Sequence, residues 1–211
     1  MTTLLLCNGE PPSRALARRC LRMADHLVAA DGGANSARQL GLTPDLIVGD
    51  LDSVTAATRR AFAGVTIVRV RRQDNTDIEK ALDHIRADGG KKVIVLGATG
   101  GRIDMTLANL SACWRYVASM ELVIADDTWY AVPLRGSRSF EAQPGTRVSL
   151  IPFGVCKGIS LQGLRYPLVD GTLRIGEVAV SNVVRSRRFT VTVDRGNLLV
   201  VVFAALRQGA V

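Results

Sequence analysis

The chain has 211 residues, 47% of them hydrophobic, which is enough for one large domain or two small ones with a substantial core. Basic side chains outnumber acidic ones by 27 to 19, and the excess lies in the second part: residues 1–134 carry 16 basic and 15 acidic side chains, and residues 135–211 carry 11 and 4. Every apolar run is shorter than the ~18 residues of a membrane span, and the first residues lack the basic stretch of a signal peptide, so we expect no membrane partner. The four cysteines are dispersed along the sequence, which predicts reduced thiols in a cytoplasmic protein.

The first part of the chain alternates strand signals with helix signals. Continuous runs of Val, Ile and Leu, typical of strands covered on both faces, predict strands at 4–8, 27–31, 46–50, 66–70, 92–97 and 122–126. Helices are expected between them, at 13–23, 35–40, 56–62, 77–86 and 103–116. This alternation predicts an α/β domain with a doubly wound, mostly parallel sheet over residues 1–133.

After about residue 130 the pattern changes to short strands of period two. Such stretches occur at 146–152, 158–162, 173–175, 178–181, 189–193 and 198–203. Turn signals separate them at 143–145, 170–171 and 194–197. We therefore expect an all-β antiparallel sandwich over residues 134–211, with the change between the two domains near residues 130–137.

Four aspartates in three short motifs follow predicted buried strands. Asp31 opens Asp-Gly-Gly-Ala-Asn, Asp50 and Asp52 lie in Gly-Asp-Leu-Asp-Ser, and Asp77 ends Gln-Asp-Asn-Thr-Asp. Open α/β sheets bind ligands at the carboxyl ends of their strands. Clustered carboxylates repel one another unless a cation neutralises them, and Mg²⁺ takes oxygen ligands that it usually shares with substrate phosphates. The motifs therefore predict a site for Mg²⁺ and phosphate.

Asp50 and Asp52 carry the strongest geometric argument. In extended backbone, residues two apart point to the same side, so both carboxylates would face one cation. A helix N-cap role would account for Asp52 but not for Asp50 in an apolar strand. For Asp31 a plain strand-to-helix turn is an equal alternative. For Asp77 a capping role at a helix start is favoured when its motif is considered alone.

A glycine-rich loop after the fifth predicted strand is a candidate phosphate-binding loop. Gly100 and Gly101 precede Arg102 and Asp104, in a pattern that is neither a Walker A motif nor a GxGxxG fingerprint. The guanidinium of Arg102 is a forked donor suited to phosphate. Asp104 is either an acid on the metal side or a first-turn acid favoured by the helix dipole.

Polar residues in the second part give weaker signals. Ser181 and Asn182 could hydrogen-bond a heteroaromatic ligand, although a turn or a strand end is the favoured alternative. The basic run 185–188 is interpreted as a solvated loop that can also meet phosphate.

Taken together, the motifs resemble those of the thiamin pyrophosphokinase (thiamin diphosphokinase) family. The family pattern runs DGGAN, PD-x-x-x-GD-x-DS, Q-D-x-T-D and G-x-x-GGR-x-D. The corresponding residues lie, in that order, at 31–35, 44–53, 73–77 and 97–104, followed by family-like residues at 163–168 and 181–182. The match in order and spacing across most of the chain is far more specific than any single motif.

The resemblance implies an α/β catalytic domain that binds ATP and Mg²⁺, and a β-sandwich domain for thiamin binding and dimerisation. The implied reaction moves pyrophosphate from ATP to the hydroxyethyl oxygen of thiamin, giving thiamin diphosphate and AMP, in a homodimer without a nucleic-acid partner. By resemblance, the catalytic and metal-binding acids are Asp31, Asp50, Asp52 and Asp77. The residues expected to bind ATP are Gly32, Gly33, Asn35, Thr76, Gly100, Gly101, Arg102 and Asp104, and those expected to bind thiamin are Gln73, Ser181 and Asn182.

One residue departs from the family pattern. Bacterial members commonly have His where this chain has Met105, and Met can neither donate a hydrogen bond nor carry charge. A phosphate contact from that position is therefore absent or supplied elsewhere.

Two other functions stay open on the sequence alone. The first is a pyrophosphokinase for another heterocyclic alcohol, such as a pterin. The second is a non-catalytic nucleotide- or RNA-binding regulator that uses the basic second part, for which we would expect steeply salt-dependent RNA binding.

Overall fold

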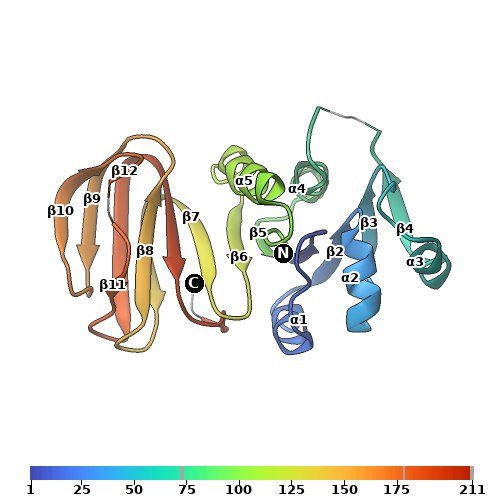
Figure 1. Ribbon diagram of the computed structural model, residues 1–211, viewed down its shortest axis with the longest axis horizontal. Helices are drawn as coiled ribbons and strands as arrows, with labels where there is room; N and C mark the ends of the chain where they lie inside the picture. The colour runs from blue at the N-terminus through green and yellow to red at the C-terminus, as the bar shows by residue number, and fades with distance from the viewer. Residues whose placement is uncertain (72–73, 178, 210–211) are drawn as a thin grey trace. The chain divides into compact units, whose positions relative to one another are not determined.

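The computed structural model of the protein describes residues 1–71, 74–177 and 179–209 (Figure 1). The chain forms two compact units, Met1–Asp127 and Thr128–Val211. The expected domain boundary after residue 133 falls inside a strand of the second unit, Tyr130–Glu141. Within the part of the chain that the structure describes, no helix combines the length and apolar character needed to cross a membrane.

The first unit alternates strands and helices as the sequence predicts. Its strands are β1 (Thr2–Leu6), β2 (His26–Ala30), β3 (Leu46–Gly49), β4 (Thr66–Arg69), β5 (Lys92–Leu96) and β6 (Glu121–Ala125). Its helices are α1 (Arg14–Leu21), α2 (Gly33–Leu40), α3 (Ala56–Ala61), α4 (Asp77–Ala87) and α5 (Ile103–Ala112), and a 3₁₀ turn, η1 (Cys113–Arg115), follows α5. Each predicted element is found, and the bounds differ by a few residues.

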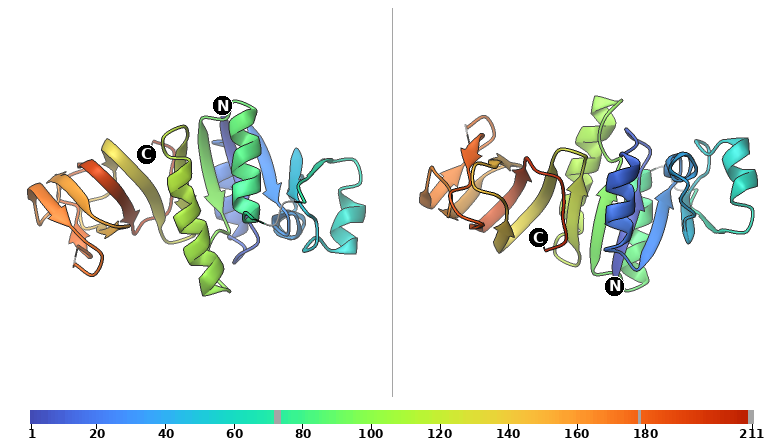
Figure 2. Two further views of the ribbon diagram at one scale, coloured as in Figure 1. Left: turned by 90° about the horizontal axis from the view of Figure 1, so that it is seen from above. Right: turned by 90° about the horizontal axis from the view of Figure 1, so that it is seen from below.

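The strands of the first unit form a parallel sheet in the order β6-β5-β1-β2-β3-β4. From β1 the chain adds β2, β3 and β4 on one side, and then returns to place β5 on the other side of β1. Helices α1 and α2 cover one face of the sheet and α4 and α5 cover the other (Figure 2). The loops at the carboxyl ends of β1 and β5 therefore diverge, and such a switch point is where ligands bind in open α/β sheets.

Burial along the sheet follows from this order. Leu4, Leu5 and Leu6 of the central strand β1 are fully buried, because helices cover both faces there. Burying a side chain of this size contributes about 1.5–3 kcal/mol. The outer strand β4 is mostly exposed. The core therefore anchors the strand ends that surround the switch point.

The second unit is built from antiparallel strands, as predicted. They are β7 (Tyr130–Glu141), β8 (Arg147–Pro152), β9 (Cys156–Gln162), β10 (Leu168–Leu173), β11 (Asn182–Val183) and β12 (Arg188–Val202). The long strand β12 pairs with β7 along its length, with β9 through its first half and with β8 through its second half. Phe140 of β7 and Phe189 of β12 stack in the core with ring centroids 5.0 Å apart.

Two predictions about long strands in this unit are wrong. Residues 130–137, expected at the boundary between the domains, begin strand β7, and Tyr130 is buried in the core. Residues 189–193 and 198–203 were expected to be two strands, whereas β12 is continuous from Arg188 to Val202 with a register shift between Val193 and Leu198. The turn-forming residues at 194–197 make a bulge in this strand, and composition alone does not separate a bulge from a turn.

Two further predictions about short strands are also wrong. The strand expected at 173–175 lies at Leu168–Leu173, and the supposed turn at Asp170 is an irregularity inside it, with φ 49°. Residues 179–181 are not a strand, because the pairing with β8 begins at Asn182. Residue 178 of that predicted strand lies outside the described residues.

Candidate functional site

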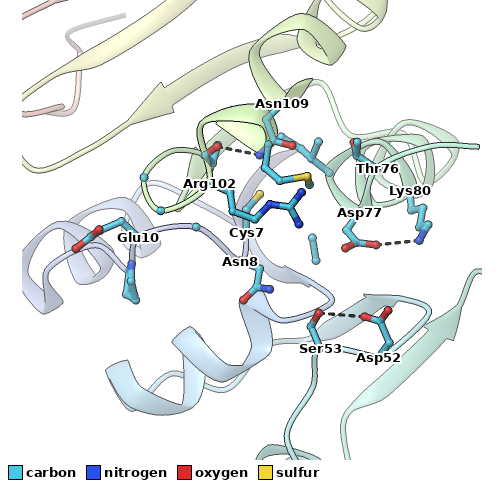
Figure 3. Close-up of a pocket in the computed structure, with 18 of the residues that line it drawn as sticks. Cys7, Asn8, Glu10, Asp52, Ser53, Thr76, Asp77, Lys80, Arg102 and Asn109 are labelled. Carbon is cyan, nitrogen blue, oxygen red and sulfur yellow. Dashed lines mark hydrogen bonds and ion pairs between the residues drawn. The ribbon is translucent and has the colours of Figure 1, made fainter. Parts of the chain in front are cut away.

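A pocket of about 790 Å³ opens at the carboxyl ends of the parallel strands (Figure 3). Its walls are the loops after β1, β3 and β5, the residues before α4, and the first turns of α4 and α5. The volume suits a small-molecule ligand. The predicted site residues that line it are Asp50, Asp52, Thr76, Asp77, Gly100, Gly101 and Arg102, and Met105 lies among them.

Three of the predicted aspartates gather at this sheet edge. Asp31 follows β2, Asp50 follows β3 and Asp77 begins α4. Each offers one carboxylate oxygen, and the three oxygens lie within 4.8 Å of one another. An all-oxygen donor set of this kind suits Mg²⁺. The structure therefore brings together acids from three separate motifs.

Asp31 is the fully buried member of this cluster. Its Oδ2 accepts a hydrogen bond from the Ser53 backbone N–H at 3.2 Å, but its Oδ1 has no partner among the described residues. Burial and the nearby charge of Asp77 raise the pKa of Asp31 to about 6. A buried acceptor without a donor, beside two more carboxylates, fits the binding of a cation.

The glycine of the Gly-Asp-Leu-Asp-Ser motif makes room for Asp31. A Cβ on Gly49 would lie 2.7 Å from the Cβ of Asp31, so a side chain at residue 49 would displace the carboxylate. Asp31 itself has φ 42°, a left-handed conformation that is uncommon outside glycine. This backbone outlier lies at the predicted site, as strained residues often do.

Lys80 is a site residue that we did not predict from the sequence. Its Nζ lies 2.9 Å from Asp77 Oδ1 (Figure 3) and 3.0 Å from Asp50 Oδ2, and its side chain is 4% exposed. Burial lowers the pKa of Lys80, but its hydrogen bonds to Asp77 and Asp50 outweigh this and raise the pKa above its usual value. The hydrogen bond from Lys80 likewise lowers the pKa of Asp50.

The geometric argument for Asp50 and Asp52 is wrong. Strand β3 ends at Gly49, and Leu51 has φ 70°, so the backbone between the two acids is not extended. Asp52 lines the pocket but is exposed, and its carboxylate accepts a hydrogen bond from Ser53 Oγ at 3.0 Å. It lies outside the group of three described above. A metal-binding role for Asp52 remains a prediction.

The residues that follow Asp31 pack against the end of β1 and do not line the pocket. A Cβ on Gly32 would meet the side chain of Asn8 at 2.3 Å, and one on Gly33 would lie 2.1 Å from the carbonyl oxygen of Leu6. The two glycines therefore let α2 start against the end of β1. Neither they nor Asn35, which were expected to bind ATP, are among the residues that line the pocket.

Asn35 instead positions the loop after β3. Its Nδ2 donates to the carbonyl oxygen of Ser53 at 2.8 Å, and its Oδ1 accepts from the backbone N–H of Thr55 at 3.1 Å. Ser53 is the residue whose N–H reaches Asp31. Asn35 is thus connected to the acidic cluster through one intervening residue.

The glycine-rich loop packs its backbone against the loop after β1. The N–H of Gly9 donates to the carbonyl of Gly97 at 2.7 Å, and a Cβ on Gly100 would lie 2.5 Å from that of Glu10. Gly100 and Gly101 have φ of 86° and 66°, in the region that favours glycine. Asn109 of α5 holds the start of the loop by donating to the carbonyl of Ala98 at 2.8 Å.

Arg102 extends over the pocket from this loop (Figure 3). It forms an ion pair with Asp104, and both side chains are largely exposed. The hydrogen bond from Arg102 lowers the pKa of Asp104. Asp104 therefore faces Arg102 and not the three clustered carboxylates.

The start of α4 decides between the two interpretations of Asp77. Thr76 is the N-cap residue, and its N–H and Oγ1 both donate to Glu79 Oε2, at 2.9 and 3.0 Å. Glu79 is buried and also pairs with Arg115. Because Thr76 occupies the cap position, the carboxylate of Asp77 is turned toward Lys80.

The residues expected to bind thiamin have different surroundings. Asn182 is buried and accepts from the Tyr166 N–H at 2.9 Å, donates to the Tyr166 carbonyl at 2.7 Å and accepts from the Val183 N–H at 2.8 Å. Ser181 is exposed, has φ 62°, and donates its N–H to Ser149 Oγ. Gln73 lies outside the described residues.

Comparison with known proteins identifies the relatives of this chain. The family model "Thiamin pyrophosphokinase, catalytic domain" matches residues 17–124, and "Thiamin pyrophosphokinase, vitamin B1 binding domain" matches residues 139–198. Thiamine pyrophosphokinase 1 of Arabidopsis thaliana is 28% identical over 166 residues, which is 72% of this chain and 62% of that protein. The thiamine pyrophosphokinase of Bacillus subtilis is 26% identical over 182 residues, 82% of this chain and 85% of that protein.

Solved structures share the fold of this chain. The crystal structure of thiamine pyrophosphokinase from Bacillus subtilis superimposes with a TM-score of 0.84 at 22% identity, covering 98% of this chain and all of that one. Thiamin pyrophosphokinase from Candida albicans gives a TM-score of 0.83 at 17% identity, covering 95% and 88%. Since the two family models together match well over half of the residues, the chain belongs to the thiamin pyrophosphokinase family.

Proposed function

We propose that the protein transfers the pyrophosphoryl group of ATP to thiamin. The hydroxyethyl oxygen of thiamin forms a bond to the β-phosphorus of ATP, the bond from the β-phosphorus to the α-phosphate oxygen breaks, and AMP and the hydroxyl proton leave. The observation that carries this proposal is the cluster of Asp31, Asp50 and Asp77 in a pocket that a glycine-rich loop also lines, at the switch point of the sheet, in a chain of this family.

Magnesium is the cation that we propose for the acidic cluster. Asp31, Asp50 and Asp77 would hold it, and Asp52 is a further candidate because it lines the same pocket. The all-oxygen donor set supports this choice, and so does Oδ1 of Asp31, which has no partner in the part of the chain that the structure describes. When bound, Mg²⁺ neutralises charge on phosphate oxygens and on the leaving AMP.

The chain supplies the remaining contacts for ATP. We propose that Arg102 binds phosphate through its planar guanidinium and that its ion pair with Asp104 keeps it extended over the pocket. The N–H groups of Gly100 and Gly101 and the start of α5 favour the same anion. Thr76 lines the pocket and could also meet phosphate, whereas Gly32, Gly33 and Asn35 act by shaping the loops.

Thiamin recognition is proposed for the residues matched by the vitamin B1 binding model, together with Gln73. Ser181 and Asn182 lie within the residues matched by the vitamin B1 binding model. Asn182 would act by fixing the backbone of Tyr166, since most of its hydrogen-bonding capacity is used there. Gln73 is proposed to contact thiamin because it begins the motif that ends at Asp77. A homodimer is part of the proposal, and light scattering of the purified chain tests it.

The proposed setting is the cytoplasm. All four cysteines are free and buried, which is compatible with a reducing compartment. Localisation of the tagged full chain in its native cell tests this assignment.

The reaction is tested by following AMP and thiamin diphosphate from ATP, Mg²⁺ and thiamin. We expect equal amounts of both products, and a fall in kcat of at least about 100-fold in Asp50→Asn, since a charge that positions the reacting phosphates is lost. Asp88→Asn, at the other end of α4, is the matched control and should keep its activity.

The alternative functions predict different products. AMP formation with a pterin alcohol but not with thiamin would contradict the proposal and favour the second pyrophosphokinase. Tight, salt-dependent RNA binding without AMP release would favour a regulator. The family assignment favours thiamin over both.

A further inference from the structure

A buried lysine lies inside the acidic cluster. The ammonium of Lys80 donates to Asp77 Oδ1 at 2.9 Å and to Asp50 Oδ2 at 3.0 Å, and its side chain is 4% exposed. A buried ammonium is costly unless it is paired, so these two carboxylates fix its position. The other oxygen of Asp50, Oδ1, accepts the backbone N–H of Asp52 at 3.3 Å.

The position of Lys80 on α4 ties two parts of the site together. Asp77 lies three residues before it on the same helix, whereas Asp50 follows strand β3. The apolar stripe of α4 is formed by Ile78, Ala81, Leu82 and Ile85, and Lys80 is buried beside this stripe, one turn after Asp77. The lysine thus connects the start of α4 to the carboxylate of Asp50 on the loop after β3.

Helix formation does not explain this arrangement. The start of α4 is already capped by the hydrogen bonds between Thr76 and Glu79. The apolar face of α4 is completed by Ile78, Ala81, Leu82 and Ile85, so the packing of the helix does not require a side chain buried at residue 80. The lysine is therefore better explained by the charges around it than by the stability of the helix.

The charge of the cluster supports a specific role. The three clustered carboxylates alone carry a charge of −3, and the ammonium of Lys80 reduces it to −2, the charge that one divalent cation balances; Asp52 is exposed and lies outside this group of three. Building on the magnesium site of the proposed function, we propose that Lys80 is a positioning residue that serves as a permanent cation of the cluster. It sets the spacing of Asp50 and Asp77 and restricts the nucleotide-free cluster to a single divalent cation.

Binding of Mn²⁺ in the absence of nucleotide tests this inference. Free Mn²⁺ is measured by electron paramagnetic resonance during a titration at about pH 8, where Asp31 is ionised. We expect one ion per wild-type chain. Lys80→Met keeps the apolar stem but removes the positive charge that repels a cation a few ångströms away. For this variant we expect Mn²⁺ to bind at least about tenfold more tightly, or a second Mn²⁺ ion to bind.

Two variants separate charge from packing. Lys80→Arg keeps the charge and should bind a single ion as wild type does. Lys92→Met removes the same charge from the pair between Lys92 and Glu121 at the other end of the sheet, and its Mn²⁺ binding should be unchanged. If Lys80→Met needs Mn²⁺ to fold, its melting temperature should rise more with Mn²⁺ than that of wild type.

Several outcomes would overturn the inference. The first is equal Mn²⁺ affinity and stoichiometry in wild type and Lys80→Met. The second is a melting temperature of Lys80→Met that does not rise with Mn²⁺, and the third is binding of two ions to nucleotide-free wild type. Wild type that binds no Mn²⁺ would overturn both the inference and the magnesium assignment. Wild type that binds one Mn²⁺ but forms no AMP with thiamin would contradict only the proposed reaction.

Discussion

The backbone N–H of Ser53 donates a hydrogen bond to Oδ2 of the buried carboxylate of Asp31 at 3.2 Å. The other oxygen, Oδ1, has no partner within the described ranges. One donor does not compensate for complete burial beside the charge of Asp77, so the pKa of Asp31 is raised. Without a cation, the ionised form of Asp31 therefore destabilises the folded chain.

Asp31→Asn should stabilise the metal-free protein near neutral pH. The folded-state pKa, about 6, lies above the unfolded value, so the folded state holds its proton more tightly and loses stability as pH rises from about 4 to about 6. We expect the variant to gain about 1–3 kcal/mol in the free energy of unfolding at about pH 7 and little at about pH 4. Urea unfolding with chelator at both pH values measures the difference.

Asp88→Asn is the control for this comparison, because Asp88 is an exposed carboxylate on the same unit. It should show the wild-type dependence of stability on pH. A loss of stability in Asp31→Asn at both pH values would mean that the carboxylate is better accommodated than its surroundings indicate.

Asn35→Ala should weaken the site mainly through loop position. Its amide holds both Ser53 and Thr55, so its removal frees the loop that supplies the hydrogen bond to Asp31. We expect a cost of about 1–2 kcal/mol in unfolding free energy and a higher Mg²⁺ concentration for half-maximal activity. Gln39→Ala, at an exposed position of the same helix, should change neither. Equal Mg²⁺ dependence in both variants would contradict the role.

The acidic cluster shows what sequence reasoning can and cannot predict. Apolar strand runs followed by acids correctly placed Asp31, Asp50 and Asp77 at one edge of a parallel sheet, because strand polarity fixes where the loops lie. The pairing of Asp50 with Asp52 failed because it assumed an extended backbone, and Leu51 is left-handed. A single dihedral angle at a strand end is not visible in hydrophobic periodicity.

The role of Lys80 and the continuity of β12 were missed for related reasons. The spacing of Lys80 from Asp77 places both at one end of α4, but a lysine among apolar residues normally suggests a solvated face. Its partner Asp50 is distant in sequence, so only the fold brings the two together. In β12, the turn signal at 194–197 produced a bulge because the pairing with β7 resumes after it.

Glu79→Ala should be much more harmful than Arg115→Ala. Glu79 is buried and receives the Thr76 donors that begin α4, next to Asp77, whereas the Arg115 side chain is 69% exposed. We expect Glu79→Ala to cost about 2–4 kcal/mol of unfolding free energy, since buried donors lose their acceptor, and Arg115→Ala less than about 1 kcal/mol. Thermal and urea unfolding measure both. Similar losses would show that the ion pair, and not the cap, anchors the helix.

Asn182→Ala should lower the free energy of unfolding, because the Asn182 side chain holds the protein's own backbone. The Asn182 amide makes three hydrogen bonds with the backbones of Tyr166 and Val183, all partly buried, and their loss should cost about 1–3 kcal/mol in unfolding free energy. Ser181→Gly is the matched variant at the next residue: it relieves a φ of 62° and should stabilise by up to about 1 kcal/mol. If Ser181 contacts thiamin, Ser181→Gly should raise the KM for thiamin while the KM for ATP is unchanged. Full stability in Asn182→Ala, together with a raised thiamin KM, would instead make Asn182 the ligand contact and contradict its structural role.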